Sequence, residues 1–418
     1  MGIKEIYKLY SKYYLADTDT RSIREHTLFF ALKGANFNGN KFVTAALKSG
    51  ADYAIIDEVE FEVPNKTILV ANVLETLQEL AKYHRLQLKA PIIALTGSNG
   101  KTTTKELIHA VLSEKYNTTA TVGNLNNHIG VPLTLLSMTP NTQIGIVEMG
   151  ANHQKEIEFL CTIAAPDFGY ITNFGKAHLE GFGGIEGVIK GKSELYSFLD
   201  AHGKMVFINP KDALQVGKTK QLKTISFPSD LMFLEANPFV QIALGDLRIL
   251  SNLIGDYNYT NIFAAITMGA YFGVENQHIK KAIENYIPSN NRSQIIEKES
   301  NQIILDAYNA NPSSMKVALE NFSKIKKVSK VVILGDMFEL GNESSIEHQE
   351  IVNLADAFCF SQTLYVGAHF HKAQTKNKQF ENFEALEAYL IENTLENQSV
   401  LIKGSRGMRL ERVLEFIT

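Results

Sequence analysis

A short loop between an apolar run and a helical pattern carries the clearest chemistry in this chain. Residues 92–95 are apolar, and the segment that follows reads Thr96-Gly97-Ser98-Asn99-Gly100-Lys101-Thr102-Thr103-Thr104. Backbone N–H groups of such a loop, together with the positive end of the following helix, attract phosphate oxygens. Lys101 can reach the outer phosphates, and the Thr102 hydroxyl can ligate a magnesium ion. The segment therefore predicts an ATP site.

The spacing of the two loop glycines differs from the common G-x-x-x-x-G-K-T pattern. Leu95 stands five residues before Gly100, and the first glycine of the loop is Gly97. Gly-Ser-Asn-Gly is also ordinary turn chemistry, so a simple turn is the alternative. The combination of apolar strand, loop, Lys-Thr pair and helical pattern favours nucleotide binding.

Two further apolar runs lead into groups that could bind a cation. Glu148 ends the run that begins at residue 144, and His178 follows the run 169–172. Because open α/β sheets present catalytic groups at the carboxyl ends of their strands, Glu148 is expected to ligate magnesium, and His178 could ligate a second ion. A turn carboxylate and a packed or surface imidazole are the respective alternatives.

Tyr257, Asn258 and Asn261 lie just before a helical segment with small residues at 262–266. The ring of Tyr257 could stack on adenine, while the amides of Asn258 and Asn261 could read the edge of the base. Capping of the helix by Asn258 is the alternative.

The last third of the chain places charged groups after apolar runs. Asp306 and Asp336 each end such a run, and Lys403 and Arg406 add cations after another. These clusters suggest a domain that closes over the nucleotide, with isolated turn carboxylates as the alternative for either aspartate.

The framework that must position these groups is an α/β protein of three domains. A chain of 418 residues is too long for one core. Residues 1–88 contain short mixed segments and a helical stretch at 74–88, which indicate a small α/β domain with a helical linker. Residues 89–290 alternate apolar runs with helical patterns, as in a central parallel-sheet ATP-binding domain. Residues 291–418 repeat this alternation, so a second doubly wound, Rossmann-like unit is expected, with compact hinges at about 89 and 290 and ligands between domains.

The composition points to small-molecule partners. The net charge is −4, with 21% charged and 45% hydrophobic residues, so neither nucleic acid nor an acidic membrane surface is required as a partner. Cys161 and Cys359 lack metal-type spacing and are expected to be buried free thiols, which is typical of a reducing compartment. No apolar run approaches the roughly 18 residues of a membrane span, and the first residues lack the core of a signal peptide, so we expect a cytoplasmic location.

Taken in order along the chain, these motifs resemble the Mur ligase family. The resemblance covers nearly the whole chain and rests on the segments 96–104, 123–134, 148–152, 173–180, 306–312, 334–341 and 403–406. The short Gly-to-Gly span is also how the phosphate loop of this family reads. The family's reaction phosphorylates a substrate carboxylate with ATP, after which an amine attacks the acyl phosphate and an amide forms.

The third-domain motifs resemble the branch of the family that adds a dipeptide. Residues 308–312 read Tyr-Asn-Ala-Asn-Pro and residues 335–341 read Gly-Asp-Met-Phe-Glu-Leu-Gly. The resemblance implies that D-alanyl-D-alanine is joined to UDP-N-acetylmuramoyl-tripeptide, giving the pentapeptide precursor of peptidoglycan. The alternatives are a sister ligase that adds the third amino acid, against which the missing Asp-Asn-Pro-Arg motif argues, a folylpolyglutamate synthetase, and a nucleotide switch without ligase activity.

The resemblance also implies catalytic and metal-binding roles. Lys101 would stabilise charge on the transferring phosphoryl group, Thr102 and Glu148 would hold a first magnesium ion, and His178 a second. Lys192 matches a lysine that the family carries as a carbamate, an anion that can join the metal shell. Lys190 is a nearby competitor for that role.

Binding roles follow from the same resemblance. Contacts to ATP are implied for Asn258, Asn261, Arg292, Asp306 and Tyr257, the last in place of a more usual histidine. Contacts to the other substrates are implied for Asp19, Arg21, Asn124, Asn126, Asn127, Tyr308, Asn309, Asn311, Asp336 and Arg406. Asn38 stands where the family usually has Asp, which puts one uridine-side contact in doubt. We expect a monomer.

Overall fold

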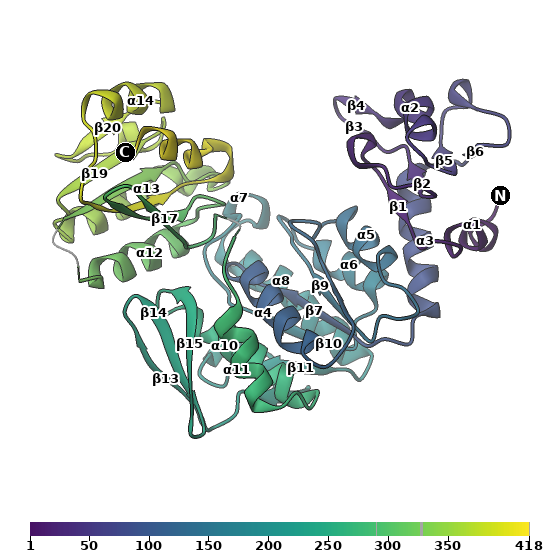
Figure 1. Ribbon diagram of the computed structural model, residues 1–418, viewed down its shortest axis with the longest axis horizontal. Coiled ribbons are helices and arrows are strands. Elements are labelled where there is room, and N and C mark those ends of the chain that lie inside the picture. Colours follow the sequence, from purple (N-terminus) through teal and green to yellow (C-terminus); the bar gives the residue numbers. More distant parts are fainter. Residues whose placement is uncertain (290, 327–328, 418) are drawn as a thin grey trace.

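The computed structural model describes residues 1–289, 291–326 and 329–417, which form three α/β units in chain order (Figure 1). The first unit has a parallel sheet in the order β1-β2-β5-β6. Its elements are α1 (Ile3–Tyr10), β1 (Ala16–Asp17), β2 (Leu28–Phe30), β3 (Lys33–Gly34), β4 (Phe37–Asn38), α2 (Val43–Lys48), β5 (Tyr53–Ile56), β6 (Thr67–Leu69) and α3 (Val73–Gln87). The expected α/β character and the helix over 74–88 are confirmed.

The central unit is built on a six-stranded parallel sheet in the order β12-β11-β10-β7-β9-β8. Its strands are β7 (Ile92–Thr96), β8 (Thr118–Ala120), β9 (Ile144–Glu148), β10 (Phe168–Ile171), β11 (Met205–Ile208) and β12 (Lys223–Ser226). The connecting helices are α4 (Lys101–Ser113), α5 (Gly130–Leu136), α6 (Glu156–Ala164), α7 (Leu179–Phe182), α8 (Ile185–Ala201) and α9 (Ala213–Lys218). The apolar runs 92–95, 144–148 and 169–172, which lead into the predicted site residues, are the parallel strands β7, β9 and β10. Every residue of β7 and β9 is buried, as a central position in such a sheet requires.

The second part of the central unit departs from the expected alternation. Strands β13 (Leu231–Ala236), β14 (Phe239–Leu244) and β15 (Leu247–Ile254) form a separate antiparallel sheet, followed by α10 (Asn258–Tyr271) and α11 (Asn276–Asn285). Short links of two residues connect these strands, and the turn at Gly245 has a positive φ of 55°, so hairpins form where crossover helices were expected.

The C-terminal unit is a six-stranded sheet in the order β16-β17-β21-β18-β19-β20, parallel except for the β16–β17 pair. Its strands are β16 (Gln294–Lys298), β17 (Asn301–Asp306), β18 (Lys330–Gly335), β19 (Gln362–Val366), β20 (Lys378–Phe380) and β21 (Ser399–Lys403). The main helices are α12 (Pro312–Lys324), α13 (Ser344–Ala357) and α14 (Phe383–Glu392). The expected doubly wound unit is confirmed, while the predicted join at residue 290 lies outside the described residues.

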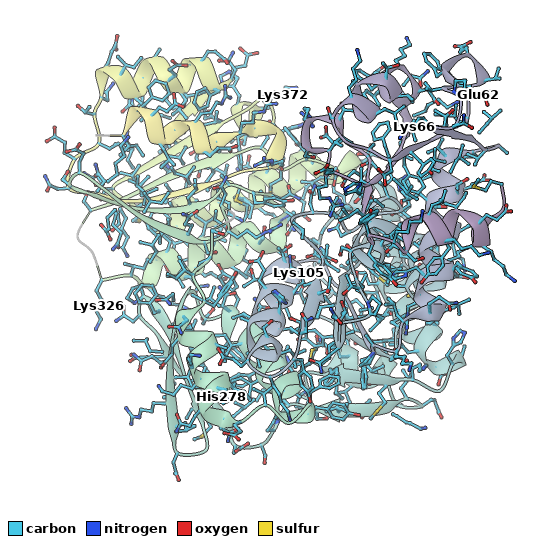
Figure 2. All side chains as sticks on the ribbon, turned by 45° about the vertical axis from the view of Figure 1, so that its right-hand side comes forward. Glu62, Lys66, Lys105, His278, Lys326 and Lys372 are labelled. Atoms are coloured by element: carbon cyan, nitrogen blue, oxygen red, sulfur yellow. The ribbon has the colours of Figure 1, made fainter. Side chains whose placement is uncertain are left out.

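Most charged side chains lie on the outer surface, whereas the central unit buries several, among them Lys105 and Glu148. Figure 2 shows Glu62 and Lys66 at the rim of the first unit and Lys105 in the middle of the molecule. The Lys105 ammonium donates to the carbonyl of Thr121 over 2.7 Å, which compensates its burial. Among the described residues, no helix combines the length and hydropathy that crossing a membrane requires. Cys161 is buried as expected, whereas Cys359 is exposed, contrary to expectation.

The first unit is attached to the central unit through a buried aromatic cluster around His84 of α3. Nε2 of His84 donates to the carbonyl of Met138 over 3.0 Å, and the rings of Tyr7, Tyr10 and Tyr14 surround the imidazole. The Tyr10 hydroxyl donates to the carbonyl of Leu136 over 2.7 Å. Burial lowers the pKa of His84 to about 4, so the ring is neutral in the folded protein.

We predict that protonation of His84 weakens the fold in acid. The unfolded chain titrates near the ordinary value of about 6.5, so it binds this proton before the folded chain does as the pH falls. The free energy of unfolding should therefore fall by roughly 3 kcal/mol between about pH 6.5 and 4 from this group alone. Urea unfolding across this range measures it. His84→Gln should remove this part of the slope, while His278→Gln, at an exposed position, should keep it.

Candidate active site

The phosphate loop connects β7 to α4 through two glycines with positive φ. Gly97 has φ 146° and Gly100 has φ 79°, values that other residues rarely adopt. A Cβ atom on Gly97 would lie 1.9 Å from Oγ1 of Thr172, so the loop backbone packs directly on the end of β10. The position of the first glycine, which made the spacing unusual, is thus required by close contact.

Residues after β10 hold the loop by hydrogen bonds to its main chain. The carbonyl of Asn99 accepts from Oγ1 of Thr172 at 2.6 Å and from Nδ2 of Asn173 at 3.0 Å, and the Asn99 N–H donates to Oδ1 of Asn173. Oγ of Ser98 donates to the carbonyl of Gly175 and accepts from its N–H. Thr172 and Asn173 were not predicted to hold the loop. Their role follows from the pairing of β7 with β10, and the amino-acid sequence alone does not reveal which strands are neighbours.

Helix α10 supports the loop from the other side. Oδ1 of Asn261 accepts from the Thr104 hydroxyl at 3.0 Å, and a Cβ on Gly100 would lie 2.8 Å from the same oxygen. Nδ2 of Asn261 donates to Oδ1 of Asn258, whose own amide donates to the carbonyl of Ile254. The capping alternative for Asn258 is wrong, because α10 begins at this residue and its side chain reaches back to β15.

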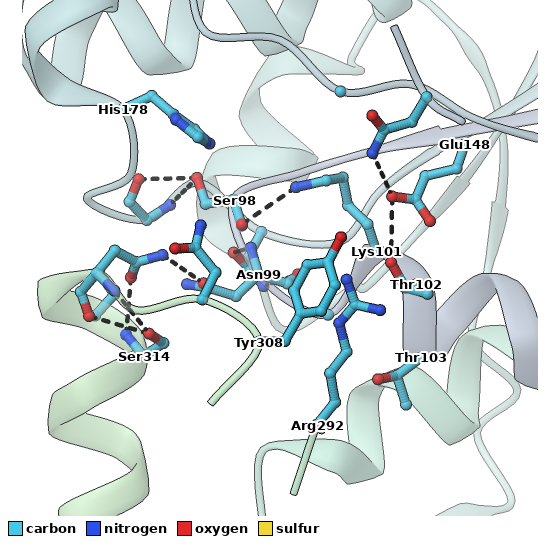
Figure 3. Close-up of a pocket in the computed structure, with 18 of the residues that line it drawn as sticks. Ser98, Asn99, Lys101, Thr102, Thr103, Glu148, His178, Arg292, Tyr308 and Ser314 are labelled. Carbon is cyan, nitrogen blue, oxygen red and sulfur yellow. Dashed lines mark hydrogen bonds between the residues drawn. The ribbon is translucent and has the colours of Figure 1, made fainter. Parts of the chain in front are cut away.

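The buried carboxylate of Glu148 lies beside the loop (Figure 3). Oε1 of Glu148 accepts from Nδ2 of Asn126 at 2.8 Å and from the Thr102 hydroxyl at 3.3 Å. The other oxygen, Oε2, is buried and has no hydrogen-bond partner among the described residues. A buried carboxylate oxygen without a partner is costly, and a hard cation beside a threonine hydroxyl would satisfy it. The donor set therefore fits a magnesium ion.

Lys101 lies at the start of α4 with its ammonium turned onto its own loop. Nζ donates to the carbonyls of Gly97 at 2.7 Å and Ser98 at 3.3 Å. Burial lowers the pKa of Lys101, the Arg292 guanidinium lowers it further, and Glu148 opposes both. The ammonium is thus placed where a multiply charged anion would favour its charged form.

A cavity of about 770 Å³ unites this loop with the C-terminal unit. It brings together most residues that the sequence singled out, and these come from the phosphate loop, β9, the loops after β8 and β10, α10 and the third domain. The predicted residues that line it are Ser98, Asn99, Gly100, Lys101, Thr102, Thr103, Asn124, Asn126, Asn127, Glu148, His178, Tyr257, Asn258, Asn261, Arg292, Asp306, Tyr308, Asn309 and Asn311.

The C-terminal wall of the cavity is built from two strand ends. Lys403 ends β21 and donates to Oδ2 of Asp306 at the end of β17 over 2.6 Å. The guanidinium of Arg292 lies 3.6 Å from the ring centre of Tyr308, which gives a flat cationic surface. Asn311, the N-cap of α12, donates from Nδ2 to Oδ1 of Asn99 at 2.8 Å, so this domain touches the phosphate loop directly.

The hydroxyl of Tyr257 hydrogen-bonds Oγ of Ser293 at 2.6 Å, across the join of the central and C-terminal units. Burial raises the pKa of the Tyr257 hydroxyl, which stays protonated. The ring of Tyr257 lines the cavity, which is compatible with stacking on adenine. The stacking contact itself stays a prediction.

Several predicted contacts lie elsewhere. The carboxylate oxygens of Asp336 accept from the N–H groups of His369 and Phe370, and the side chain is buried outside the cavity, so we correct its assignment from dipeptide contact to scaffold. Arg406 is exposed, does not line the cavity and pairs with Glu411 at 3.5 Å, but its guanidinium lies 5.6 Å from the ring centre of the cavity residue Tyr308. Asp19 and Arg21 pair with one another on the surface of the first unit, which lowers the pKa of Asp19 to about 2.

Lys192 of α8 is fully buried and does not line the cavity. Its Nζ has no hydrogen-bond partner among the described residues and lies 5.2 Å from the ring centre of Phe182. Burial lowers the pKa of Lys192 well below its ordinary value, and the charge of Lys101 lowers it further. This shift favours the neutral amine, a form that could be modified or act as a ligand. Lys190, the competitor, is exposed.

His178 precedes α7 with its side chain on the cavity (Figure 3). Its Nδ1 hydrogen-bonds the carboxylate of Glu339 from the C-terminal unit. This bond lowers the pKa of Glu339, which stays ionised.

Comparison with known proteins places these features in a family. The description "Mur ligase middle domain" matches residues 95–269, "Mur ligase, glutamate ligase domain" residues 291–406, and "Mur ligase family, catalytic domain" residues 12–85. The UDP-N-acetylmuramoyl-tripeptide–D-alanyl-D-alanine ligase of Bacillus subtilis is 35% identical over 95% of this chain and 92% of its own length.

Solved structures agree with this likeness. A crystal structure of MurF from Acinetobacter baumannii gives a TM-score of 0.82 at 30% identity, covering 96% of this chain and 92% of that one. The MurF ligase from Thermotoga maritima in complex with ADP gives 0.82 at 26% identity, covering 96% of each chain.

We predict that Gly97→Ala disables nucleotide binding. Its Cβ would clash with Oγ1 of Thr172 and displace the loop, and displacements of about 1 Å can cost about 100-fold in catalysis. Calorimetric titration with ADP and magnesium measures the loss. The control is Gly217→Ala in α9, where nothing lies within 4 Å of the new atom. It should gain about 0.5–1 kcal/mol of stability and bind ADP unchanged. Equal ADP affinity in both variants would contradict the prediction.

Proposed function

The chain belongs to the Mur ligase family, and on this premise we propose that it joins D-alanyl-D-alanine to UDP-N-acetylmuramoyl-tripeptide at the expense of ATP. The product is the UDP-N-acetylmuramoyl-pentapeptide precursor of peptidoglycan. The observation that carries this function is the single cavity in which the phosphate loop and Glu148 face Arg292, Asp306 and Tyr308 of the third domain. The relative from Bacillus subtilis carries the name of this reaction and aligns over 95% of this chain.

The reaction has two steps with different charge demands. The terminal carboxylate of the tripeptide takes the γ-phosphoryl group of ATP, and ADP leaves. The dipeptide amine then attacks the acyl phosphate, phosphate leaves, and the nitrogen loses a proton as the amide forms. The Lys101 ammonium and the loop N–H groups stabilise the charge on the phosphoryl oxygens. Thr102 and the free oxygen of Glu148 would hold magnesium, which neutralises phosphate charge when bound.

Positioning provides the rest of the catalysis. The carboxylate and the amine are brought together between two domains, so the cavity supplies proximity and excludes water. We assign Tyr257, Asn258, Asn261, Arg292 and Asp306 to the nucleotide side of the cavity, and Asn124, Asn126, Asn127, Tyr308, Asn309 and Asn311 to the acyl and dipeptide side. The exposed pair Asp19 and Arg21 is assigned to the UDP end of the substrate, with Arg406 at the outer edge of the third domain. We further propose that the protein acts as a cytoplasmic monomer.

Lys192 is proposed to carry a carbamate. Its uncharged amine would attack carbon dioxide, forming an N–C bond and releasing a proton, and the resulting anion would join the metal shell. Support comes from the burial of Nζ without a partner and from the neighbouring positive charge of Lys101, which an anion at this position would offset.

The assignment of function predicts that phosphate release from ATP requires both other substrates. With magnesium, UDP-N-acetylmuramoyl-tripeptide and D-alanyl-D-alanine, a coupled phosphate assay should show turnover, and omission of either substrate should abolish it. Release without the dipeptide would indicate a nucleotide switch. Release only with a single amino acid and UDP-N-acetylmuramoyl-dipeptide would indicate the sister ligase.

The carbamate proposal predicts a difference between two lysines on one helix. Lys192→Ala should lower kcat by at least about 100-fold, because an anion of the metal shell is lost, and added bicarbonate should not restore it. Lys190→Ala should keep activity, since this side chain is exposed. ¹³C NMR with labelled bicarbonate should give a carbamate signal in the native protein and in Lys190→Ala. A signal that persists in Lys192→Ala would refute the assignment.

A further inference from the structure

The central and C-terminal units meet at a pair of residues that both hold a rare backbone conformation. His178 has φ 54° and Glu339 has φ 62°, in the left-handed region that non-glycine residues seldom adopt. The imidazole of His178 and the carboxylate of Glu339 are hydrogen-bonded across the interface. Conformations of this kind are energetically unfavourable and concentrate at functional sites.

The backbone around this pair is docked as well. The N–H of Glu180 donates to the carbonyl of Glu339 over 3.2 Å, and Gly341 lies so close to Glu180 that a Cβ on the glycine would be 3.2 Å from that side chain. Lys176, in the loop after β10, pairs with the buried carboxylate of Glu347 in α13 at 2.5 Å, which adds a contact between the same two units. The His178–Glu339 contact is therefore part of a docked surface and differs from an isolated surface ion pair.

The partner of Nδ1 determines what the other nitrogen of His178 can do. An ionised carboxylate only accepts hydrogen bonds, so in the neutral imidazole the proton sits on Nδ1 and Nε2 keeps its lone pair. Within the described part of the chain, Nε2 has no hydrogen-bond partner. Figure 3 shows the ring on the same side of the cavity as Ser98 of the phosphate loop.

We propose that Glu339 is a positioning residue for His178, holding the proton on Nδ1 and turning the lone pair of Nε2 toward a cation at the phosphate site. A carboxylate that fixes a metal-binding histidine in this way raises the basicity of the ligating nitrogen and sets its ring orientation. The proposal rests on the proposed function, because it needs a divalent cation beside the nucleotide.

Glu339 and the residues that contact Glu148 belong to different domains. Asn126 and Thr102, which hold Glu148, belong to the central unit, whereas Glu339 belongs to the C-terminal unit. The residues that would hold the first cation are therefore all positioned within the central unit. His178 is positioned as a cation ligand only when the C-terminal unit is docked, so docking and binding of the second cation are coupled.

The test titrates three variants of the whole chain with Mn²⁺ in the presence of ADP. Electron paramagnetic resonance measures how much Mn²⁺ is bound at each step. Glu339→Gln keeps the shape of the side chain and removes the charge. Glu339→Asp keeps the charge, and Glu343→Gln is the matched control at an exposed position four residues later. ¹⁵N NMR of labelled histidine reports the protonation of each ring nitrogen, with His178→Gln identifying the signal. Thermal unfolding checks that each variant is folded.

Glu339→Gln should weaken one class of Mn²⁺ site by about tenfold or more, leave the other class unchanged, and reduce the Nδ1-protonated form of His178. Glu339→Asp should recover part of the lost affinity, and Glu343→Gln should match the native protein. Native Mn²⁺ affinity and an unchanged His178 tautomer in folded Glu339→Gln would overturn the proposal. These readouts need no turnover, so a failed ligase assay would count against the proposed function without affecting this result.

Discussion

The structure depends on one steric constraint, the direct contact between the backbone of the phosphate loop and the end of β10. At Gly97 the space for a side chain is taken by the Thr172 hydroxyl, which also donates to the carbonyl of Asn99. The N–H groups of Ser98 and Asn99 donate to Asn173, just after β10, so the loop keeps this course only if β10 lies beside β7. Because Gly100 packs on Asn261 and Asn99 on Asn311, the same loop also fixes where α10 and the third domain must lie.

The two interdomain contacts of the central unit differ in chemistry, and this difference sets which domain can move. The first unit packs through buried aromatic rings around His84, whose hydrogen bond to Met138 excludes water. The third unit docks through amides and ion pairs, such as Asn311 with Asn99 and Lys324 with Asp256. Polar contacts exchange with water at small net cost, whereas separating the aromatic cluster would expose apolar area. Opening and closing is therefore expected at the third domain.

Strand-end chemistry could be predicted from the sequence, because apolar runs followed by polar groups identify Lys101, Glu148 and Asp306. Which strand ends lie side by side, and therefore which of their side chains contact one another, could not be predicted. Asp306 and Asp336 look alike in sequence, yet β17 lies beside β21, which brings Lys403 to Asp306 at the cavity. β18 lies beside β19, so Asp336 meets the turn after that strand and caps its N–H groups. The order of strands in the sheet is a long-range property, and the clamp by Thr172 and Asn173 was missed for the same reason.

Charge explains why this site should accept a polyanion and why the buried Lys192 behind it should lose its charge. Lys101 and Arg292 lie near one another, and burial together with Arg292 lowers the pKa of Lys101. Lys192 adds a third basic group, for which burial outweighs the opposing charges of Glu156 and Glu194, while Glu148 opposes the loss of charge on Lys101 at the loop. A triphosphate relieves the repulsion between Lys101 and Arg292 from the cavity side. It does not reach the buried Nζ of Lys192, where conversion of the amine to an anion would relieve the repulsion and supply a cation ligand at once.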